Sequence, residues 1–303
     1  MAIRFDNKVV IVTGAGGGLG RCHALDFAKR GAKVVVNDLG GAVDGTGGSS
    51  DAAKAVVAEI KAAGGVAIGN GASVTDDVGV VHLIKETMDA FGRIDVIIAN
   101  AGILRDKSFA KMELKDFEIV MNVHVIGSVK PIKAAWDIMK TQQYGRIVVT
   151  TSSTGLYGNF GQTNYGAAKL GLVGFMNTLK LEGAKDNIKV NAICPVAATR
   201  MTKNLMPPEV LERLKPEYVT PAVVYLASDD APTGTILTAG AGVFSAARIV
   251  ETNGVNLGHG ADADTVAENI GKITDFTGAQ HYTMGNEQGA KIFSRLQEKP
   301  VKP

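Results

Sequence analysis

Short apolar runs alternate with longer segments of helical periodicity along the first two thirds of the chain. The runs are continuous and rich in β-branched residues, which is typical of strands buried on both faces of a parallel sheet. The predicted strands are Lys8–Thr13, Lys33–Asp38, Val66–Ile68, Asp95–Ala99, Arg146–Thr151 and Lys189–Ile193. The predicted helices are Leu19–Arg30, Asp51–Ala63, Asp76–Phe91, Lys115–Met139 and Tyr165–Lys185. Pro131 lies inside the fourth helix, and we expect it to kink or end that helix.

The alternation predicts an α/β fold, a doubly wound parallel sheet of the Rossmann type with helices on both faces. No shift in composition divides the chain before about Pro232, so we expect one domain over residues 1–242. Residues 243–303 are expected to form a C-terminal extension, with helix-like stretches at Ala263–Ile273 and Gln288–Leu296. Ligands bind at the carboxyl ends of strands in such folds, so the residues after each strand are the first site candidates.

A glycine-rich sequence, TGAGGGLG (Thr13–Gly20), follows the first predicted strand and precedes a helix. Glycines there let the backbone approach a pyrophosphate, and the N–H groups and dipole of the helix N-terminus attract its charge. A merely flexible turn explains this order of elements less well. We therefore predict dinucleotide binding by Gly14, Gly18, Leu19 and Gly20.

Asp38 ends the second predicted strand, 18 residues after Gly20. A carboxylate in this place binds the ribose hydroxyls of NAD and repels the 2′-phosphate of NADP. No Lys or Arg lies between Gly14 and Gly20. The sequence therefore predicts NAD as the cofactor, with a turn-capping role as the alternative for Asp38.

Tyr165 and Lys169 lie four residues apart at the start of a predicted helix, so both side chains share one face. A phenol with a pKa near ~10 is a poor base at neutral pH, and a neighbouring ammonium group lowers that pKa. Ser152 follows a predicted strand, where its hydroxyl can hydrogen-bond a reacting oxygen, and Ser153 is its nearest competitor. Asn122 can hold a water molecule or a helix bulge in a proton path. We predict that Tyr165 is the general acid/base, assisted by the other candidates.

Together these features resemble the short-chain dehydrogenase/reductase family, from Asn7 to about Gly242. The motifs that carry the resemblance are TGAGGGLG, the tripeptide Asn100–Gly102, Asn122, Ser152 and YGAAK at Tyr165–Lys169. The resemblance implies an NAD-dependent enzyme in which the tyrosine exchanges a proton while a hydride passes to or from nicotinamide. It implies that Lys169 also holds the nicotinamide ribose. The further cofactor contacts that it implies are Ser73, Val74, Asn100, Ala101, Gly102, Tyr165 and Thr199.

Two positions depart from the usual pattern of that family. Ala72 stands where an Asp near the adenine is common, and Val196 stands where a Gly is common. A backbone group beside Ser73 can replace the missing adenine contact.

A narrower likeness is to one branch of the family, the (3R)-3-hydroxyacyl-CoA dehydrogenases found in peroxisomal multifunctional enzymes. It is carried by VNDLGG (Val36–Gly41), RDKSF (Arg105–Phe109), GLYGNFGQTNYGAAKLGL (Gly155–Leu172) and LKPEYVTP (Leu214–Pro221). This likeness implies hydride transfer between NAD and carbon 3 of a (3R)-3-hydroxyacyl-CoA, in the β-oxidation of fatty acids or steroid side chains.

Three other functions remain as alternatives. A 17β-type hydroxysteroid dehydrogenase would carry the same catalytic residues. A 3-oxoacyl carrier protein reductase would normally use NADPH, which Asp38 opposes. A non-catalytic NAD-bound scaffold would be expected to lose Tyr165 or Lys169, and both are present.

Composition argues against other classes of partner. The net charge is +2 and no apolar run approaches the ~20 residues of a membrane span, so we expect no nucleic acid and no membrane insertion. Neither the two cysteines nor the histidines show metal-ligand spacing, so no metal is expected. The expected partners are a small-molecule acyl-CoA or steroid substrate and further copies of the chain, as a homodimer or homotetramer. Met1–Lys8 lacks the apolar region of a signal peptide, and the final residues are not a peroxisomal tripeptide, so a cytoplasmic location is expected.

Some polar residues near the predicted site fit a structural role better than a chemical one. His124 is interpreted as a core or surface histidine. Arg105 and Lys107 could meet a CoA phosphate, but a solvated loop is favoured. The region after Pro232 has no catalytic motif, and we expect it to cover the acyl pocket or a subunit interface.

Overall fold

The computed structural model describes residues 2–49, 51–198 and 208–300. The chain divides into two compact units, Met1–Ala246 and Ala247–Pro303. Every residue predicted for the site belongs to the first unit.

An eight-stranded sheet with the order β3-β2-β1-β4-β5-β6-β7-β8 forms the centre of the first unit. The strands are β1 (Val9–Thr13), β2 (Lys33–Asn37), β3 (Val66–Asn70), β4 (Val96–Ala99), β5 (Gly145–Thr150), β6 (Ile188–Pro195), β7 (Ile236–Gly240) and β8 (Val243–Ala247). All pairs from β3 to β7 are parallel. The strand order reverses between β1 and β4, which is where open α/β sheets bind their ligands. The predicted doubly wound sheet is confirmed.

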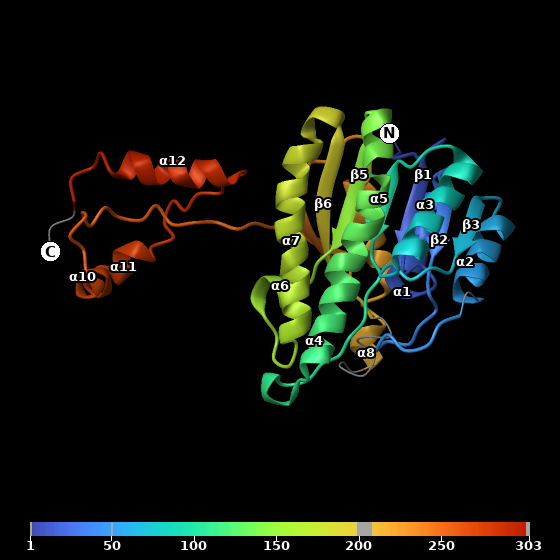
Figure 1. Cartoon of the computed structure of the whole chain (residues 1–303), viewed down its shortest axis with the longest axis horizontal. Coiled ribbons are helices and arrows are strands. Elements are labelled where there is room, and N and C mark those ends of the chain that lie inside the picture. The colour runs from blue at the N-terminus through green and yellow to red at the C-terminus, as the bar shows by residue number, and fades with distance from the viewer. Residues whose placement is uncertain (1, 50, 199–207, 301–303) are drawn as a thin grey trace. The chain divides into compact units, whose positions relative to one another are not determined.

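Helices cover both faces of this sheet (Figure 1). On one face lie α3 (Asp77–Phe91), α4 (Leu114–Met121), α5 (Gly127–Gln142) and α7 (Thr163–Gly183). The other face packs against α1 (Gly18–Lys29), α2 (Asp51–Ala62) and α9 (Thr220–Leu226). Two further α-helices of this unit, α6 (Ser153–Tyr157) and α8 (Pro208–Leu211), are short. Because both faces are covered, β1, β4 and β5 are buried at every position, which explains their continuous apolar sequences.

The predicted helix Lys115–Met139 is interrupted, but not at Pro131. α4 passes into a π-helical turn, Asn122–Ile126, before α5 begins, and Pro131 lies inside α5. The Gly127 N–H donates to the Asn122 carbonyl, five residues back, so the hydrogen-bond ladder has already shifted before the proline. The expectation of a boundary at Pro131 is therefore wrong. A π-turn inside an α-helix often marks a functional site, and this one begins at a predicted site residue.

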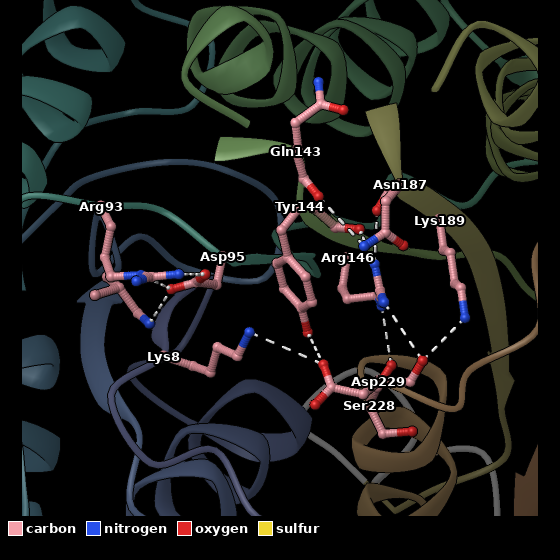
Figure 2. Close-up of polar contacts among 12 residues, drawn as sticks. Lys8, Arg93, Asp95, Gln143, Tyr144, Arg146, Asn187, Lys189, Ser228 and Asp229 are labelled. Atoms are coloured by element: carbon pink, nitrogen blue, oxygen red, sulfur yellow. Dashed lines mark hydrogen bonds and ion pairs between the residues drawn. The ribbon is translucent and has the colours of Figure 1, made fainter. Parts of the chain in front are cut away.

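A polar cluster around Arg146 fastens the amino ends of β5 and β6 to the end of α9 (Figure 2). Arg146 is 2% exposed, and its guanidinium group donates to the carbonyl oxygens of Ser228 at 2.9 Å and Asn187 at 2.8 Å. The Tyr144 ring lies 4.2 Å from the Arg146 Cζ, and its hydroxyl donates to Asp229 Oδ1 at 2.7 Å. This end of the sheet is therefore held by hydrogen bonds in addition to apolar packing.

The second unit contains α10 (Ala263–Glu268), α11 (Ile270–Ile273) and α12 (Gly285–Arg295). An antiparallel bridge pairs Glu251 with Gln280. The Lys291 ammonium on α12 donates to the Glu251 carboxylate and to the Thr252 carbonyl. The role expected for this extension, over a substrate pocket or a subunit interface, stays a prediction.

Candidate active site

The glycine-rich loop joins β1 to α1 and is fastened to the end of β4. Gly14 and Gly18 have φ angles of 64° and 51°, which strain any residue with a Cβ atom. The Asn100 side-chain amide donates to the carbonyl oxygens of Thr13 at 3.0 Å and Gly14 at 3.1 Å. The Thr13 hydroxyl accepts from the backbone N–H groups of Asn100 and Ala101. Asn100 and Ala101, predicted as cofactor contacts, thus also set the shape of the loop.

The loop has room for a ligand at the helix N-terminus. A Cβ atom added to Gly17 would meet nothing within 4 Å, so the side of the loop next to α1 is open. A Cβ atom on Gly14 would lie 2.8 Å from the Ala101 Cα, so the opposite side is closed by the segment that follows β4. The first backbone N–H groups of an α-helix have no partner within the helix, so those at the start of α1 suit a pyrophosphate.

Asp38 lies directly against the glycine-rich loop. Its Oδ2 accepts from the Gly16 N–H at 2.7 Å and its Oδ1 accepts from the Gly40 N–H at 2.6 Å. The carboxylate thus caps the turn after β2, and it also supports the loop. Both roles leave it beside the place where the ribose of a dinucleotide on this loop would lie.

The segment Ala72–Val74, at the end of β3, is held by two buried asparagines that sequence reasoning missed. Asn37 donates to the Asn70 side chain at 2.8 Å and to the Ala72 carbonyl at 2.9 Å. Asn70 in turn accepts from the Ala72 N–H at 3.0 Å. In the sequence, the two asparagines at the ends of neighbouring strands could have indicated this contact. Their effect is to fix the backbone where the family's usual Asp is missing.

Ser152, Tyr165 and Lys169 meet at the carboxyl end of β5. Ser152 caps α6, and its Oγ accepts from the Thr154 N–H at 3.2 Å. Lys169 is 3% exposed; its Nζ lies 5.4 Å from the centre of the Tyr165 ring and donates to the Thr150 carbonyl at 2.6 Å. Ser153, the competitor of Ser152, is exposed. The structure thus brings together three of the four residues predicted to be catalytic.

Burial shifts the pKa values of Tyr165 and Lys169 in opposite directions. It raises the pKa of Tyr165 to about 12, against a smaller lowering by the Ser152 hydrogen bond. It lowers the pKa of Lys169 to about 7, because the ammonium group has lost its water. Desolvation therefore sets the direction of the Tyr165 pKa shift, and Lys169 is not among the groups that lower it, contrary to the expectation from sequence.

Asn122 and His124 lie in the π-turn beside this pair. The Asn122 side chain is exposed, and no described residue hydrogen-bonds its amide group. His124 is 1% exposed and its ring meets the Tyr165 ring edge-on, with centroids 5.1 Å apart. The structure therefore places the ring of His124, interpreted from sequence as a core or surface histidine, against Tyr165. In the sequence, only the helix bulge expected at Asn122 could have indicated that His124 lies beside Tyr165.

The loop after β4 is tied to α4 by ion pairs. Arg105 and Lys107 both contact the buried Asp116 carboxylate, at 2.8 Å and 3.0 Å. Their hydrogen bonds lower the pKa of Asp116. Lys107 is exposed, as expected for a solvated loop, but a buried acidic partner 11 and 9 positions away also engages both cations.

A second network joins the same loop to the start of α7. Gln162 donates to Asp106 at 2.7 Å and accepts from the Thr154 hydroxyl at 2.9 Å. Asn164 donates to the Arg105 carbonyl at 3.0 Å. These bonds hold the loop before Tyr165 against the loop after β4, so the tyrosine extends from a fixed platform.

Thr199, predicted as a cofactor contact, lies outside the described residues. Within the described ranges, no group of three or more His, Cys, Asp or Glu side chains could hold a metal ion. In the same ranges, no helix has the length and apolar character needed to cross a bilayer.

Comparison with known proteins gives the class of the chain. Residues 8–209 match the short chain dehydrogenase family. The chain therefore belongs to this family and is an oxidoreductase that uses a nicotinamide dinucleotide. The family match agrees with the open glycine-rich loop and with the arrangement of Ser152, Tyr165 and Lys169.

Similar proteins extend the likeness beyond the family match. Peroxisomal multifunctional enzyme A of Dictyostelium discoideum is 48% identical over 302 residues, 99% of this chain and 68% of that protein. The structure of full-length peroxisomal multifunctional enzyme type 2 from Drosophila melanogaster has a TM-score of 0.83 and 36% identity, covering 97% of this chain and half of that one. A 7α-hydroxysteroid dehydrogenase complexed with NADH and 7-oxo glycochenodeoxycholic acid has a TM-score of 0.71 and 29% identity, covering 79% of this chain and 95% of that one.

Proposed function

We propose that the chain is an NAD-dependent (3R)-3-hydroxyacyl-CoA dehydrogenase. The observation that carries this proposal is the extent of the likeness to the multifunctional enzymes. It covers 99% of the chain, whereas the family match ends at residue 209. The likeness therefore includes the second unit, which the family match does not reach.

The residues present suit a dinucleotide, and Asp38 supports the choice of NAD. The open start of α1 would hold the pyrophosphate, and Lys169 has spare donors for a ribose. The Asp38 carboxylate beside Gly16 would accept from ribose hydroxyls and would repel a 2′-phosphate. The NADH named in the hydroxysteroid dehydrogenase structure agrees with this choice.

The chemistry of the site follows from three side chains. When bound, the dinucleotide supplies the hydride acceptor or donor. During oxidation, the Tyr165 oxygen takes the proton of the substrate hydroxyl as the hydride leaves the same carbon, and in reduction it returns that proton. Ser152 donates a hydrogen bond to the reacting oxygen. Lys169 stabilises the phenolate in its charged form, and although burial lowers its pKa to about 7, part of the lysine still carries this charge near neutral pH.

An assay of NADH formation tests substrate and cofactor together. The full chain is supplied with (3R)- and (3S)-3-hydroxyacyl-CoA of several chain lengths and with a 17β-hydroxysteroid, using NAD or NADP. We expect turnover of the (3R) thioesters with NAD, at least about tenfold above the (3S) series and above NADP, since a misplaced hydroxyl or a repelled phosphate costs over ~1.4 kcal/mol. Activity on the steroid alone would refute the substrate, and faster turnover with NADP would refute the cofactor.

A hydroxysteroid dehydrogenase is the second candidate. The observation that favours it is the 7α-hydroxysteroid dehydrogenase structure, which aligns with 79% of the chain. It does not extend over the whole chain as the multifunctional enzymes do, so it ranks second. A non-catalytic scaffold ranks last because Ser152, Tyr165 and Lys169 converge.

The assembly and the location of the protein are further proposals. We expect a homodimer or homotetramer, which light scattering of the full chain would test. The cytoplasmic location expected from sequence stays a prediction, since both multifunctional relatives are named as peroxisomal. Imaging of the tagged protein in its own cell would decide between the two.

A further inference from the structure

Asn164 is a buried polar residue that directly precedes Tyr165 in the first turn of α7. It is 0% exposed, and no step of the proposed reaction uses it. Its side-chain amide donates to the Arg105 carbonyl at 3.0 Å and to the Asp116 carbonyl at 3.3 Å. Its Oδ1 accepts from the Tyr165 backbone N–H at 2.7 Å. One side chain therefore joins the backbone of the acid/base residue to the loop after β4 and to α4.

The three partners leave the Asn164 amide only one orientation. Two of them are carbonyl oxygens, which can only accept a hydrogen bond, and the third is a backbone N–H, which can only donate one. A flipped amide would lose all three bonds and leave buried polar groups unpaired, which is costly. The side chain is therefore fixed by its surroundings.

The two carbonyl acceptors belong to residues that are themselves held together. The Arg105 guanidinium lies 2.8 Å from the Asp116 carboxylate, whose side chain is 5% exposed. Helix α4, which carries Asp116, also packs against α7. The first N–H groups of a helix have no partner within the helix, so the Tyr165 N–H takes its partner from Asn164. The start of α7 is thus attached to a rigid neighbour at the residue that carries the phenol.

We propose that Asn164 is a positioning residue for proton transfer by Tyr165. It fixes the tyrosine backbone at the start of α7, and it thereby fixes the phenol oxygen relative to Ser152 and the reacting hydroxyl. A displacement of about 1 Å in a reacting group can cost about 100-fold in rate. The role acts on turnover and not on the binding of the dinucleotide. It rests on the proposed acid/base function of Tyr165, but not on the identity of the substrate.

Asn191 on β6 provides a matched control, because it makes the same set of bonds at a different place. It is also 0% exposed, and its amide donates to the carbonyl oxygens of Leu226 at 3.3 Å and Pro232 at 2.7 Å. Its Oδ1 accepts from the Thr235 N–H at 3.0 Å. These partners lie at the end of α9 and before β7, so none of them carries a residue of the acid/base site. The loss of either asparagine should lower stability by a similar amount, and only the loss of Asn164 should lower turnover.

The full-length variants Asn164→Ala and Asn191→Ala are compared with the wild type at a temperature where all three are folded. Turnover is expressed per NADH-binding site. We expect kcat of Asn164→Ala to fall about 10- to 100-fold, with the Kd for NADH within about threefold of the wild type, and kcat of Asn191→Ala to stay within about twofold. The solvent deuterium isotope effect on kcat should rise in Asn164→Ala alone, because proton transfer becomes the slow step. Equal kcat values for the two variants, or an unchanged isotope effect in Asn164→Ala, would overturn the proposal.

Asn164→Asp separates the attachment to the loop from the bond to the Tyr165 N–H. This variant keeps the shape of the side chain and an oxygen acceptor for that N–H, but it loses both amide donors. The proposal predicts a kcat as low as that of Asn164→Ala. A wild-type rate in Asn164→Asp would mean that the bond to the helix N–H is sufficient, and it would overturn the proposal.

Two milder variants cover the case in which the Asn164 variants do not fold. Arg105 and Lys107 both pair with Asp116 and are both partly exposed, but only Arg105 offers its carbonyl to Asn164. We expect Arg105→Met to lower kcat several-fold and to raise the solvent isotope effect, since it releases that carbonyl from its anchor. Lys107→Met should stay closer to the wild type in both measurements. Equal values for the two variants would overturn the proposal.

The failure of this role can be told apart from the failure of the proposed function. Any substrate that the wild type oxidises serves for these rates, so a wrong acyl-CoA assignment leaves the comparison intact. Equal rates in the asparagine variants, together with an inactive Tyr165→Phe, would overturn only the role of Asn164. Retained turnover in Tyr165→Phe would overturn the acid/base assignment and the role of Asn164 with it.

Discussion

Two buried cations at opposite ends of the sheet are treated differently by this fold. Arg146, at the amino end of β5, donates to the carbonyl oxygens of Ser228 and Asn187 and lies against the Tyr144 ring. Lys169, at the carboxyl end of the same strand, has one acceptor among the described residues, the Thr150 carbonyl. Burial lowers the pKa of both, but an arginine keeps its charge in proteins, whereas the lysine pKa falls to about 7.

The difference shows where the fold is stabilised and where it is left able to react. A buried charge with a full set of acceptors holds elements together and does not change state. A buried charge with few acceptors is costly, titrates near neutral pH and can exchange partners with a ligand. The amino end of the sheet is therefore structural, and the carboxyl end is kept for chemistry at a cost in stability.

The largest expected effect is that of Lys169→Met. Turnover should fall by about 1,000-fold, because the phenol loses its charged neighbour and the ribose loses a donor. The same substitution should raise the free energy of unfolding at low pH, where the wild type has to bury a charged lysine. In the wild type, the unfolded chain keeps the Lys169 proton up to about pH 10.5, and the folded chain releases it at about 7. The wild type therefore gains stability, relative to Lys169→Met, as pH rises through this window, by at most about 1.4 kcal/mol per pH unit.

Urea unfolding of both proteins between pH 6.5 and 9 measures this effect. The variant should have its greatest relative advantage at the lowest pH, and the gap should close as pH rises. A gap that does not depend on pH would mean that the folded lysine keeps its ordinary pKa, which would break the contrast with Arg146.

Arg146→Met should have the next largest effect, on stability instead of activity. Its removal leaves buried carbonyl groups without donors, which should lower the free energy of unfolding by about 3 kcal/mol or more. Turnover per folded molecule should stay near the wild-type value. The matched control is Arg21→Met, at a half-exposed ion pair with Glu59, which should cost under about 1 kcal/mol. Equal losses of unfolding free energy in the two variants would show that the Arg146 cluster does not stabilise the fold.

Tyr144→Phe sharpens the same comparison with a smaller change. It removes the hydrogen bond to Asp229 but keeps an aromatic ring beside Arg146. We expect a loss of about 1 kcal/mol in the free energy of unfolding and no change in kcat. A loss as large as that of Arg146→Met would assign the cluster's contribution to the hydroxyl group instead of the guanidinium.

The sequence predicts much of the carboxyl end and little of the amino end. The glycine-rich loop, Asp38 and the Tyr165–Lys169 spacing are local patterns, each directly after a strand or on one helical turn, so they can be recognised without a structure. The partners of Arg146 lie 41 and 82 residues away, and only the folded chain brings them together. The strands β7 and β8 were missed because neither is buried along its length, so neither has the continuous apolar sequence of the central strands.

His124 and Asp116 show a second limit of the sequence. The burial of His124 depends on a π-turn that shifts the helix face by one residue, and periodicity reasoning assumes a regular helix. Asp116 was not singled out, yet it decides the state of Arg105 and Lys107. Tertiary partners, not local spacing, set the role of these residues.

Replacement of Tyr165 by Phe tests the central claim most directly. This change removes one oxygen atom and keeps the ring that packs against His124. With the best substrate of the wild type, kcat should fall by about 1,000-fold or more, while the affinity for NADH, measured by fluorescence titration, stays within a few-fold of the wild type. Turnover near the wild-type level with bound NADH would contradict the assignment of Tyr165 as the acid/base.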